Sequence, residues 1–109
     1  MLFRSNINKS IMTTKQIAKS LGKVQRVEKG SNCYVYHCVN GIVLQSYRSM
    51  VAVRFNSGKV VFGPQYDYSA TTRNHICKYI GMRADERRRG VSNGTIVVLK
   101  DLDSLISEI

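Results

Sequence analysis

The chain has 109 residues, which suits one domain built around one ordinary hydrophobic core. Hydrophobic residues make up 43% of the chain and charged residues 22%, a balance that excludes wholesale disorder. Lys and Arg number 17 against 7 Asp and Glu, and the formal net charge of +10 makes nucleic acid the first partner to test. The positive charge would also attract an acidic protein or an anionic membrane surface. No apolar run approaches the length of a membrane span.

Residues 1–12 are predicted to form a flexible extension before a single domain over residues 13–109. The opening sequence MLFRSNINKSI lacks the apolar core of a secretion signal. Met12 is an alternative start to Met1, and the sequence does not decide between them. The three cysteines form an odd set without CxxC spacing, which predicts reduced thiols and a cytoplasmic protein.

The segment TTKQIAKSLG predicts a short amphipathic helix. Thr13 or Thr14 can cap its first turn, and Gly22 can end it. Ile17 and Leu21 lie four residues apart and form the apolar stripe. The same segment is typical of the first half of a helix-turn-helix, but VQRVEKGSN then reaches a turn too soon for a recognition helix.

From Val24 onward the apolar period changes from helical to alternating, which predicts strands joined by short turns. Asn40-Gly41 and Asn56-Ser57-Gly58 are turn signals, and Gly63-Pro64 ends strand pairing. The predicted fold class is therefore α+β: an antiparallel sheet of about five strands, a short N-terminal helix, and one capped helix packed on a face. The predicted strands are residues 24–28, 33–38, 42–47, 49–55, 59–62 and 95–99.

A second helix is predicted within YDYSATTRNHICKYIG, residues 66–81. Its Ser-Ala-Thr-Thr run offers capping hydroxyls, and Gly81 can end it. Ile76, Cys77 and Ile80 form its predicted apolar stripe. The polar segment that follows, MRADERRRGVSNG, predicts an exposed loop or a short frayed helix.

Metal binding and catalysis are both disfavoured by the spacing of the reactive residues. Strand alternation points His37 away from Cys38, and the helical repeat separates His75 from Cys77 by about 200°. Carboxylates are scarce, and no glycine-rich phosphate loop is present. We therefore expect no metal, no cofactor and no enzymatic activity.

Nucleic-acid binding is the predicted function, because arginines that can clamp phosphates are concentrated between positions 83 and 89. Tyrosines can add stacking surfaces for bases. The alternative is that the arginines only keep the protein soluble and that one tyrosine of each pair packs in the core. Neither the choice of DNA or RNA nor any sequence specificity is predicted. The candidate contacts are Arg83, Arg87, Arg88, Arg89, Arg73, Lys78, Arg48, Arg54, Tyr66 and Tyr68, with Tyr34 and Tyr36 as further stacking surfaces.

The start of the second helix offers one further candidate site. Thr71 and Thr72 could hold an anion at the helix N-terminus, with Arg73 completing the site. The commoner role of such hydroxyls is helix capping, and we prefer that structural interpretation. His75 is placed to form a hydrogen bond back to the strand that bears Tyr47, which would lock helix to sheet.

The segment SYRSMVAVRFNSGKVVFGPQYDYSATTRNHICKYIG resembles a small domain of bacteriophage and related prokaryotic proteins of uncharacterised function. The resemblance implies a phage-type origin and a small α+β module, with no catalytic residues to carry over. Small basic phage proteins bind nucleic acid or block a host protein such as a defence nuclease, so a phage-encoded inhibitor is the alternative function. A homodimer through an exposed sheet edge also stays open. The matching positions are Ser46-Tyr47, Val51-Ala52, Tyr68-Ser69, Thr71-Thr72, His75 and Tyr79.

Overall fold

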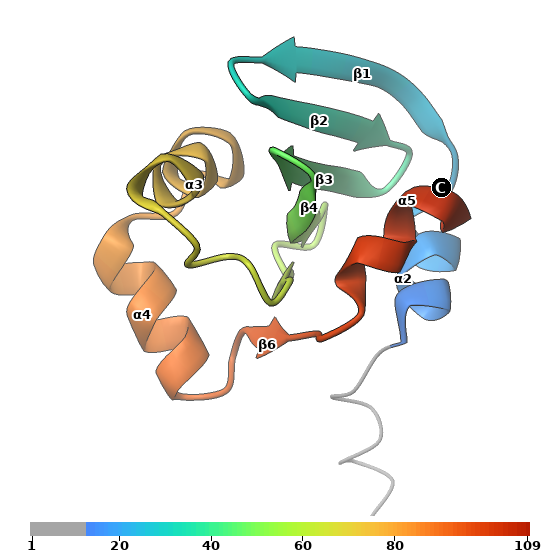
Figure 1. Cartoon of the computed structure of the whole chain (residues 1–109). Helices are drawn as coiled ribbons and strands as arrows, with labels where there is room; N and C mark the ends of the chain where they lie inside the picture. Colours follow the sequence, from blue (N-terminus) through green and yellow to red (C-terminus); the bar gives the residue numbers. More distant parts are fainter. Residues whose placement is uncertain (1–12) are drawn as a thin grey trace, which may run out of the picture.

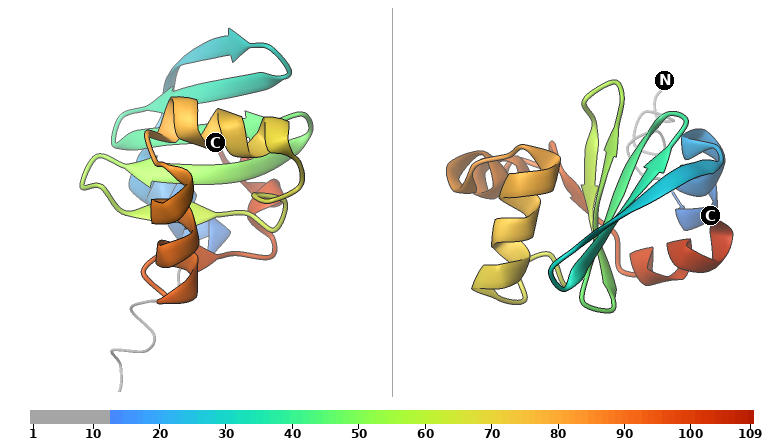
Figure 2. Two further views of the ribbon diagram at one scale, coloured as in Figure 1. Left: turned by 90° about the vertical axis from the view of Figure 1, so that its left-hand side faces the viewer. Right: turned by 90° about the horizontal axis from the view of Figure 1, so that it is seen from above.

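A six-stranded sheet lies between two layers of helices in the computed structural model, which describes residues 13–109. The extension predicted over residues 1–12 lies outside the described residues. Helices α3 and α4 cover one face of the sheet, and α2 and α5 cover the other (Figures 1 and 2). The α+β fold class is confirmed. In chain order the elements are α2 (Thr14–Leu21), β1 (Val24–Gly30), β2 (Cys33–Cys38), β3 (Gly41–Ser46), β4 (Ser49–Phe55), β5 (Val60–Phe62), α3 (Ala70–His75), the π-helical turn η1 (Ile76–Ile80), α4 (Ala84–Ser92), β6 (Val97–Val98), the 3-10 turn η2 (Leu102–Ser104) and α5 (Leu105–Glu108).

The strands follow one another across the sheet in chain order. Strands β1 to β5 pair antiparallel, so the predicted meander is confirmed. The prediction for residues 95–99 was wrong in length and direction, because only Val97–Val98 forms a strand and it runs parallel to β5. The chain passes through α3 and α4 between these two strands, and such a crossover returns it in the same direction.

Helix α2 forms where its caps and apolar stripe predict it. The Thr13 hydroxyl accepts a hydrogen bond from the Gln16 amide at 3.2 Å, and the Gln16 side chain accepts one from the Thr13 amide at 2.9 Å. Ile17 and Leu21 are fully buried against the sheet, and Gly22 ends the helix at φ +78°. Within the described residues, no helix is long and apolar enough to cross a membrane.

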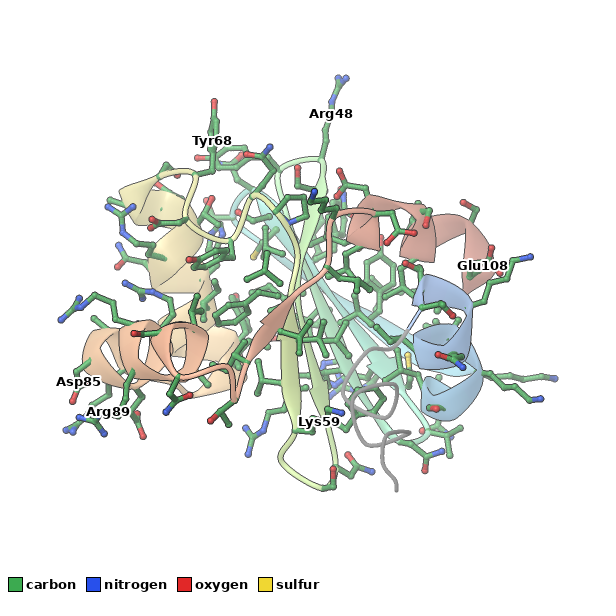
Figure 3. The ribbon with its side chains drawn as sticks, turned by 90° about the horizontal axis from the view of Figure 1, so that it is seen from below. Arg48, Lys59, Tyr68, Asp85, Arg89 and Glu108 are labelled. Carbon is green, nitrogen blue, oxygen red and sulfur yellow. The ribbon has the colours of Figure 1, made fainter. Side chains whose placement is uncertain are left out.

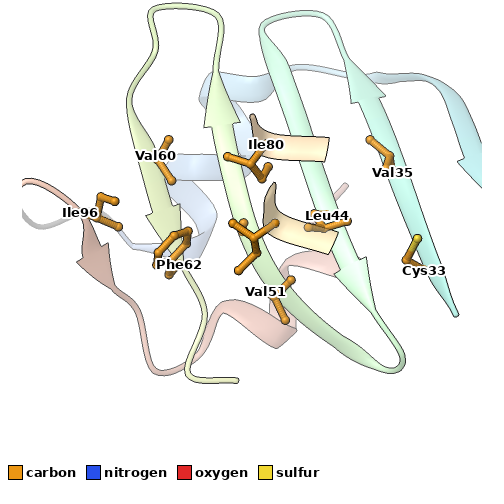
Figure 4. Packing of buried hydrophobic residues seen from close by; sticks show 10 residues of the cluster. Cys33, Val35, Leu44, Val51, Val60, Phe62, Ile80 and Ile96 are labelled. Atoms are coloured by element: carbon orange, nitrogen blue, oxygen red, sulfur yellow. The ribbon is translucent and has the colours of Figure 1, made fainter. Parts of the chain in front are cut away.

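The central strands of the sheet are buried on both faces, so the protein has two hydrophobic clusters. The cluster under α3 and α4 is shown in Figure 4, where Ile80 of η1 and strand side chains such as Leu44 and Val51 belong to one cluster. The cluster on the other face joins the sheet to α2 and α5. Cys33 belongs to the first cluster and Cys38 to the second, which confirms the predicted alternation along β2.

Helix α3 begins at Ser69, whose hydroxyl caps it, and the helical run continues through η1 to Gly81 at φ +80°. The helix and both ends agree with the prediction, but the apolar stripe does not. Cys77 is exposed, while Ile76 and Ile80 are buried. Ile76 and Ile80 lie about one turn apart and face the sheet, whereas Cys77 lies about a quarter turn from Ile76 and faces solvent.

Residues 82–94 were predicted to be a loop or a frayed helix, but Ala84–Ser92 is a helix of 9 residues. The acidic side chains of Asp85 and Glu86 lie in its first turn, where negative charge stabilises a helix by interacting with its dipole. Glu86 Oε1 also accepts a hydrogen bond from the Arg83 amide at 3.0 Å. Gly90 packs directly against the side chain of Ile96, where a Cβ would collide. Gly90 is therefore a close-packing position within the helix.

Candidate nucleic-acid interface

Four hydroxyl and imidazole side chains join α3 to the end of β3. His75 Nε2 lies 3.1 Å from the Ser31 carbonyl oxygen and Nδ1 lies 2.8 Å from Ser46 Oγ. The Thr72 hydroxyl lies 3.2 Å from both Ser46 Oγ and Ser69 Oγ. Because a carbonyl only accepts, Nε2 donates to Ser31; when Nε2 carries the only ring proton, Nδ1 accepts from the Ser46 hydroxyl. The predicted hydrogen bond from His75 to this strand is present, and it is made to Ser46, the residue before Tyr47.

The two threonines of the proposed anion site differ in their surroundings. Thr72 is 1% exposed, and its hydroxyl is engaged with two serine hydroxyls, as the structural interpretation expects. Thr71 is exposed at the start of α3. The Thr72 hydroxyl thus belongs to the internal network, and only Thr71 faces solvent.

A first hollow of about 660 Å³ lies between the β3–β4 turn and the loop before α3. Tyr68, which is 72% exposed, and Arg48 both line it and project from the same edge of the molecule (Figure 3). Tyr47 and Thr71 also line it. An aromatic ring, a guanidinium and hydroxyls therefore share one open surface, a combination suited to a base and its phosphate.

Tyr47 and Arg48 form the turn between β3 and β4, although Tyr47 was predicted to be the last residue of a strand. Tyr47 is 44% exposed and has φ +55°, a left-handed conformation that is costly for an aromatic residue. This conformation ends the strand one residue early and directs the ring to the first hollow. Sequence reasoning missed Tyr47 as a surface residue, because it continues the alternating pattern of the strand.

A second hollow of about 450 Å³ lies between the loop before α3 and helix α4. Arg73 Nη1 donates to Asp67 Oδ1 at 3.1 Å at its rim. Arg87 is only 6% exposed, which the sequence did not predict for a member of a charged run. The lining residues are Tyr66, Asp67, Arg73, Arg87, Arg88, Val91 and Ser92.

Two of the predicted basic contacts are engaged within the protein. Arg54 Nη1 donates to the Ile80 carbonyl oxygen at 2.9 Å, so this guanidinium holds the end of η1. Lys78 Nζ lies 5.1 Å from the centre of the Tyr79 ring on the same helical turn. Neither residue lines the two hollows.

Arg83 and Arg89 lie on the outward side of α4 beside its acidic residues. Arg83 Nε lies 3.7 Å from Asp85 Oδ1 and 3.9 Å from Glu86 Oε1. Arg89 Nη2 lies 3.8 Å from Asp85 Oδ2. Arg89 and Asp85 both point into solvent in Figure 3. Such exposed pairs are weak, but they reduce the positive charge that this side of α4 presents.

The four tyrosines proposed as stacking surfaces are not equivalent. Tyr36 lies on the α2 side of the sheet, where its hydroxyl donates to Gln45 Oε1 at 2.7 Å. Tyr34 is half-buried on the same strand, and Tyr66 stacks on Phe62 with ring centres 4.9 Å apart. Among these four, Tyr68 alone has most of its side chain in solvent.

Basic side chains gather around α3, α4 and the two hollows, where eight accompany three acidic ones. On the α2 and α5 side, four basic side chains accompany three acidic ones, so that layer is nearly balanced. Arg26, Lys29, Glu28 and Lys59 lie on β1 and between β4 and β5, outside both groups. The described residues carry a net charge of +8 (15 basic less 7 acidic), of which +5 (8 less 3) lies around α3 and α4. The eight are Arg48, Arg54, Arg73, Lys78, Arg83, Arg87, Arg88 and Arg89, and the three are Asp67, Asp85 and Glu86.

The reactive side chains considered for a metal site lie apart. His75 is buried in the network while Cys77 is exposed, so the predicted separation of these two is confirmed. His37 pairs instead with Glu28, at 3.0 Å between Nε2 and Oε1. Within residues 13–109, no three His, Cys, Asp or Glu side chains gather closely enough to hold a metal ion.

Comparison with curated proteins and with solved structures finds no match for this chain. A family model does match, and its description is "Family of unknown function (DUF8033)". The match spans residues 5–96 and includes both hollows and the network around His75. Because it covers most of the chain, the protein belongs to the family of unknown function DUF8033.

Proposed function

We propose that the protein is a non-enzymatic nucleic-acid-binding protein that uses the basic side around α3 and α4. The observation that carries this proposal is the segregation of charge, eight basic against three acidic side chains on one side of the sheet. A one-sided positive field attracts a polyanion and orients it toward that side. Guanidinium groups then contact phosphates with paired hydrogen bonds.

The two hollows mark the path of the nucleic acid along this side. Tyr47, Arg48 and Tyr68 supply stacking and charge at the first hollow. Arg73 and Arg88 supply charge at the second, and the loop before α3 borders both hollows. Exposed rings beside guanidiniums bind unpaired bases, so single-stranded nucleic acid is the preferred form.

Fluorescence anisotropy with labelled single-stranded DNA, single-stranded RNA and duplex DNA tests the proposal at two salt concentrations. Contacts to about four phosphates predict a roughly 50-fold loss of single-strand affinity between 50 mM and 200 mM salt. Single strands should bind more tightly than the duplex. Absence of binding to all three probes at 50 mM salt would refute the proposal.

A phage-encoded inhibitor of a host protein is the second candidate, and the sheet edge favours it. Within residues 13–109, strand β1 pairs with β2 alone, and Val27 on this edge is 50% exposed. An open edge can pair with a strand of a partner or of a second copy. A pull-down from host lysate distinguishes the two functions, because an inhibitor keeps its partner after nuclease treatment and a nucleic-acid-binding protein does not.

A further inference from the structure

Arg87 is a buried guanidinium that lines the second hollow without a partner. It is 6% exposed, and within residues 13–109 its side chain makes no hydrogen bond or ion pair. A guanidinium stays charged at all relevant pH values, so burial cannot be relieved by loss of its proton. A buried charge of this kind needs an anion to balance it.

The rest of the hollow does not supply that anion. Asp67 is the one carboxylate in the lining, and it already accepts from Arg73 at 3.1 Å. Arg88 is exposed at the rim on the next position of α4. Three guanidiniums thus share one carboxylate, which leaves an excess of two positive charges.

We infer that the second hollow is a binding site for a phosphomonoester group held by Arg87 together with Arg73 and Arg88. A phosphomonoester carries close to two negative charges at neutral pH and matches the excess, whereas a single carboxylate would leave one guanidinium unbalanced. The volume of about 450 Å³ exceeds that of a phosphate. Tyr66 and Val91 line the remaining space and suit a sugar or base attached to the phosphate.

This inference rests on the geometry around Arg87 and does not require the function proposed above. A free nucleotide and the phosphorylated end of a nucleic-acid strand both present a phosphomonoester. If the ligand is a nucleic-acid strand, the hollow would bind its phosphorylated end, while Arg48 and Tyr68 bind the adjoining nucleotides.

Calorimetric titration with inorganic phosphate and with adenosine 5′-monophosphate tests the site in three proteins: the wild type, Arg87→Met and Arg26→Met. Arg26 is the control, because it is an arginine with the same charge that lies exposed on β1, outside the hollow. Loss of charge-assisted hydrogen bonds predicts that Arg87→Met weakens phosphate binding at least about tenfold. Arg26→Met should stay within about twofold of the wild type, since it loses only a screened charge.

Equal weakening in both variants, or no phosphate binding by the wild type, would overturn the site. Thermal unfolding without phosphate checks that Arg87→Met folds, and we expect it to be at least as stable as the wild type. If Arg87→Met does not fold, phosphate binding by Asp67→Asn tests the site instead. Removing the competing carboxylate should tighten phosphate binding, and unchanged binding would contradict the inference.

Oligonucleotides with and without a 5′-phosphate identify the source of the group. A gain in affinity from the 5′-phosphate in the wild type, absent in Arg87→Met, assigns the site to strand ends. Binding of adenosine 5′-monophosphate with no binding of either oligonucleotide assigns it to free nucleotides. That second outcome would refute the proposed nucleic-acid function while supporting the phosphate site.

Discussion

Replacement of His75 by phenylalanine tests whether the hydroxyl network holds α3 on the sheet. An aromatic ring stays at this position, but both ring nitrogens are lost. His75 then no longer donates to the Ser31 carbonyl or accepts from Ser46. Each lost hydrogen bond costs about 1 kcal/mol of unfolding free energy. Ser31 lies at an exposed turn where water can replace the donor, and the Ser46 hydroxyl can rotate toward Thr72.

We therefore expect His75→Phe to lower the unfolding free energy by about 2 kcal/mol, since no buried group is left without a partner. For a chain of this size that corresponds to a fall of roughly 10 °C in melting temperature. Urea unfolding followed by far-ultraviolet circular dichroism measures the change. The chain contains no tryptophan, so tryptophan fluorescence is not an option.

Asn74→Ala is the matched control, because Asn74 lies beside His75 on the exposed side of α3. It should change the unfolding free energy by less than about 0.5 kcal/mol. A double-mutant cycle with Ser46→Ala should show coupling, since both substitutions remove the same hydrogen bond. If His75→Phe unfolds at the same urea concentration as the control, the network does not hold helix to sheet.

Three further predictions concern local structure. Tyr47→Gly should weaken single-strand binding several-fold without lowering the melting temperature, because glycine tolerates φ +55° and relieves a cost of about 1 kcal/mol; a large loss of stability would show that the ring is structural. Gly90→Ala should lower the melting temperature, because the added methyl collides with Ile96, and a neutral result would contradict the packing of α4. Burial raises the pKa of Cys38 above its ordinary 9.0, and burial together with Tyr34 raises that of Tyr36 above 10.0. The folded state then holds these protons more tightly than the unfolded state, so urea unfolding should show stability falling as pH rises above 9; a rise would contradict the burial of these groups.

Much of the fold is predictable because its elements carry local signals. Capping side chains and terminal glycines mark both ends of α2, and Gly81 marks the end of the helical run that begins at Ser69. The antiparallel hairpins follow from short turns such as Asn56-Ser57-Gly58. Each of these signals acts within a few residues, so the sequence alone expresses it.

The elements that sequence reasoning missed depend on contacts between distant segments. Gly90 becomes a helix position because Ile96 packs on it, and β6 becomes parallel because two helices intervene. The sequence predicted that the candidate site is basic, but it did not predict how its side chains are arranged. Arg87 is buried while its neighbours Arg88 and Arg89 are exposed, and a run of three arginines does not tell them apart.

The central claim is that the side of the sheet covered by α3 and α4 binds nucleic acid, and removing one positive charge on each side tests it most directly. Arg48 lines the first hollow, and Lys19 is an exposed basic residue of α2 on the other side of the sheet. Affinity for a single-stranded oligonucleotide should be measured by anisotropy at one salt concentration for Arg48→Ala, Tyr68→Ala and Lys19→Ala. We predict at least about a fivefold loss for Tyr68→Ala, since stacking contributes about 1 to 3 kcal/mol per base. We predict a similar loss for Arg48→Ala, since it removes a phosphate contact. Lys19→Ala should stay within about twofold. Equal losses for Arg48→Ala and Lys19→Ala, with no loss for Tyr68→Ala, would contradict the claim.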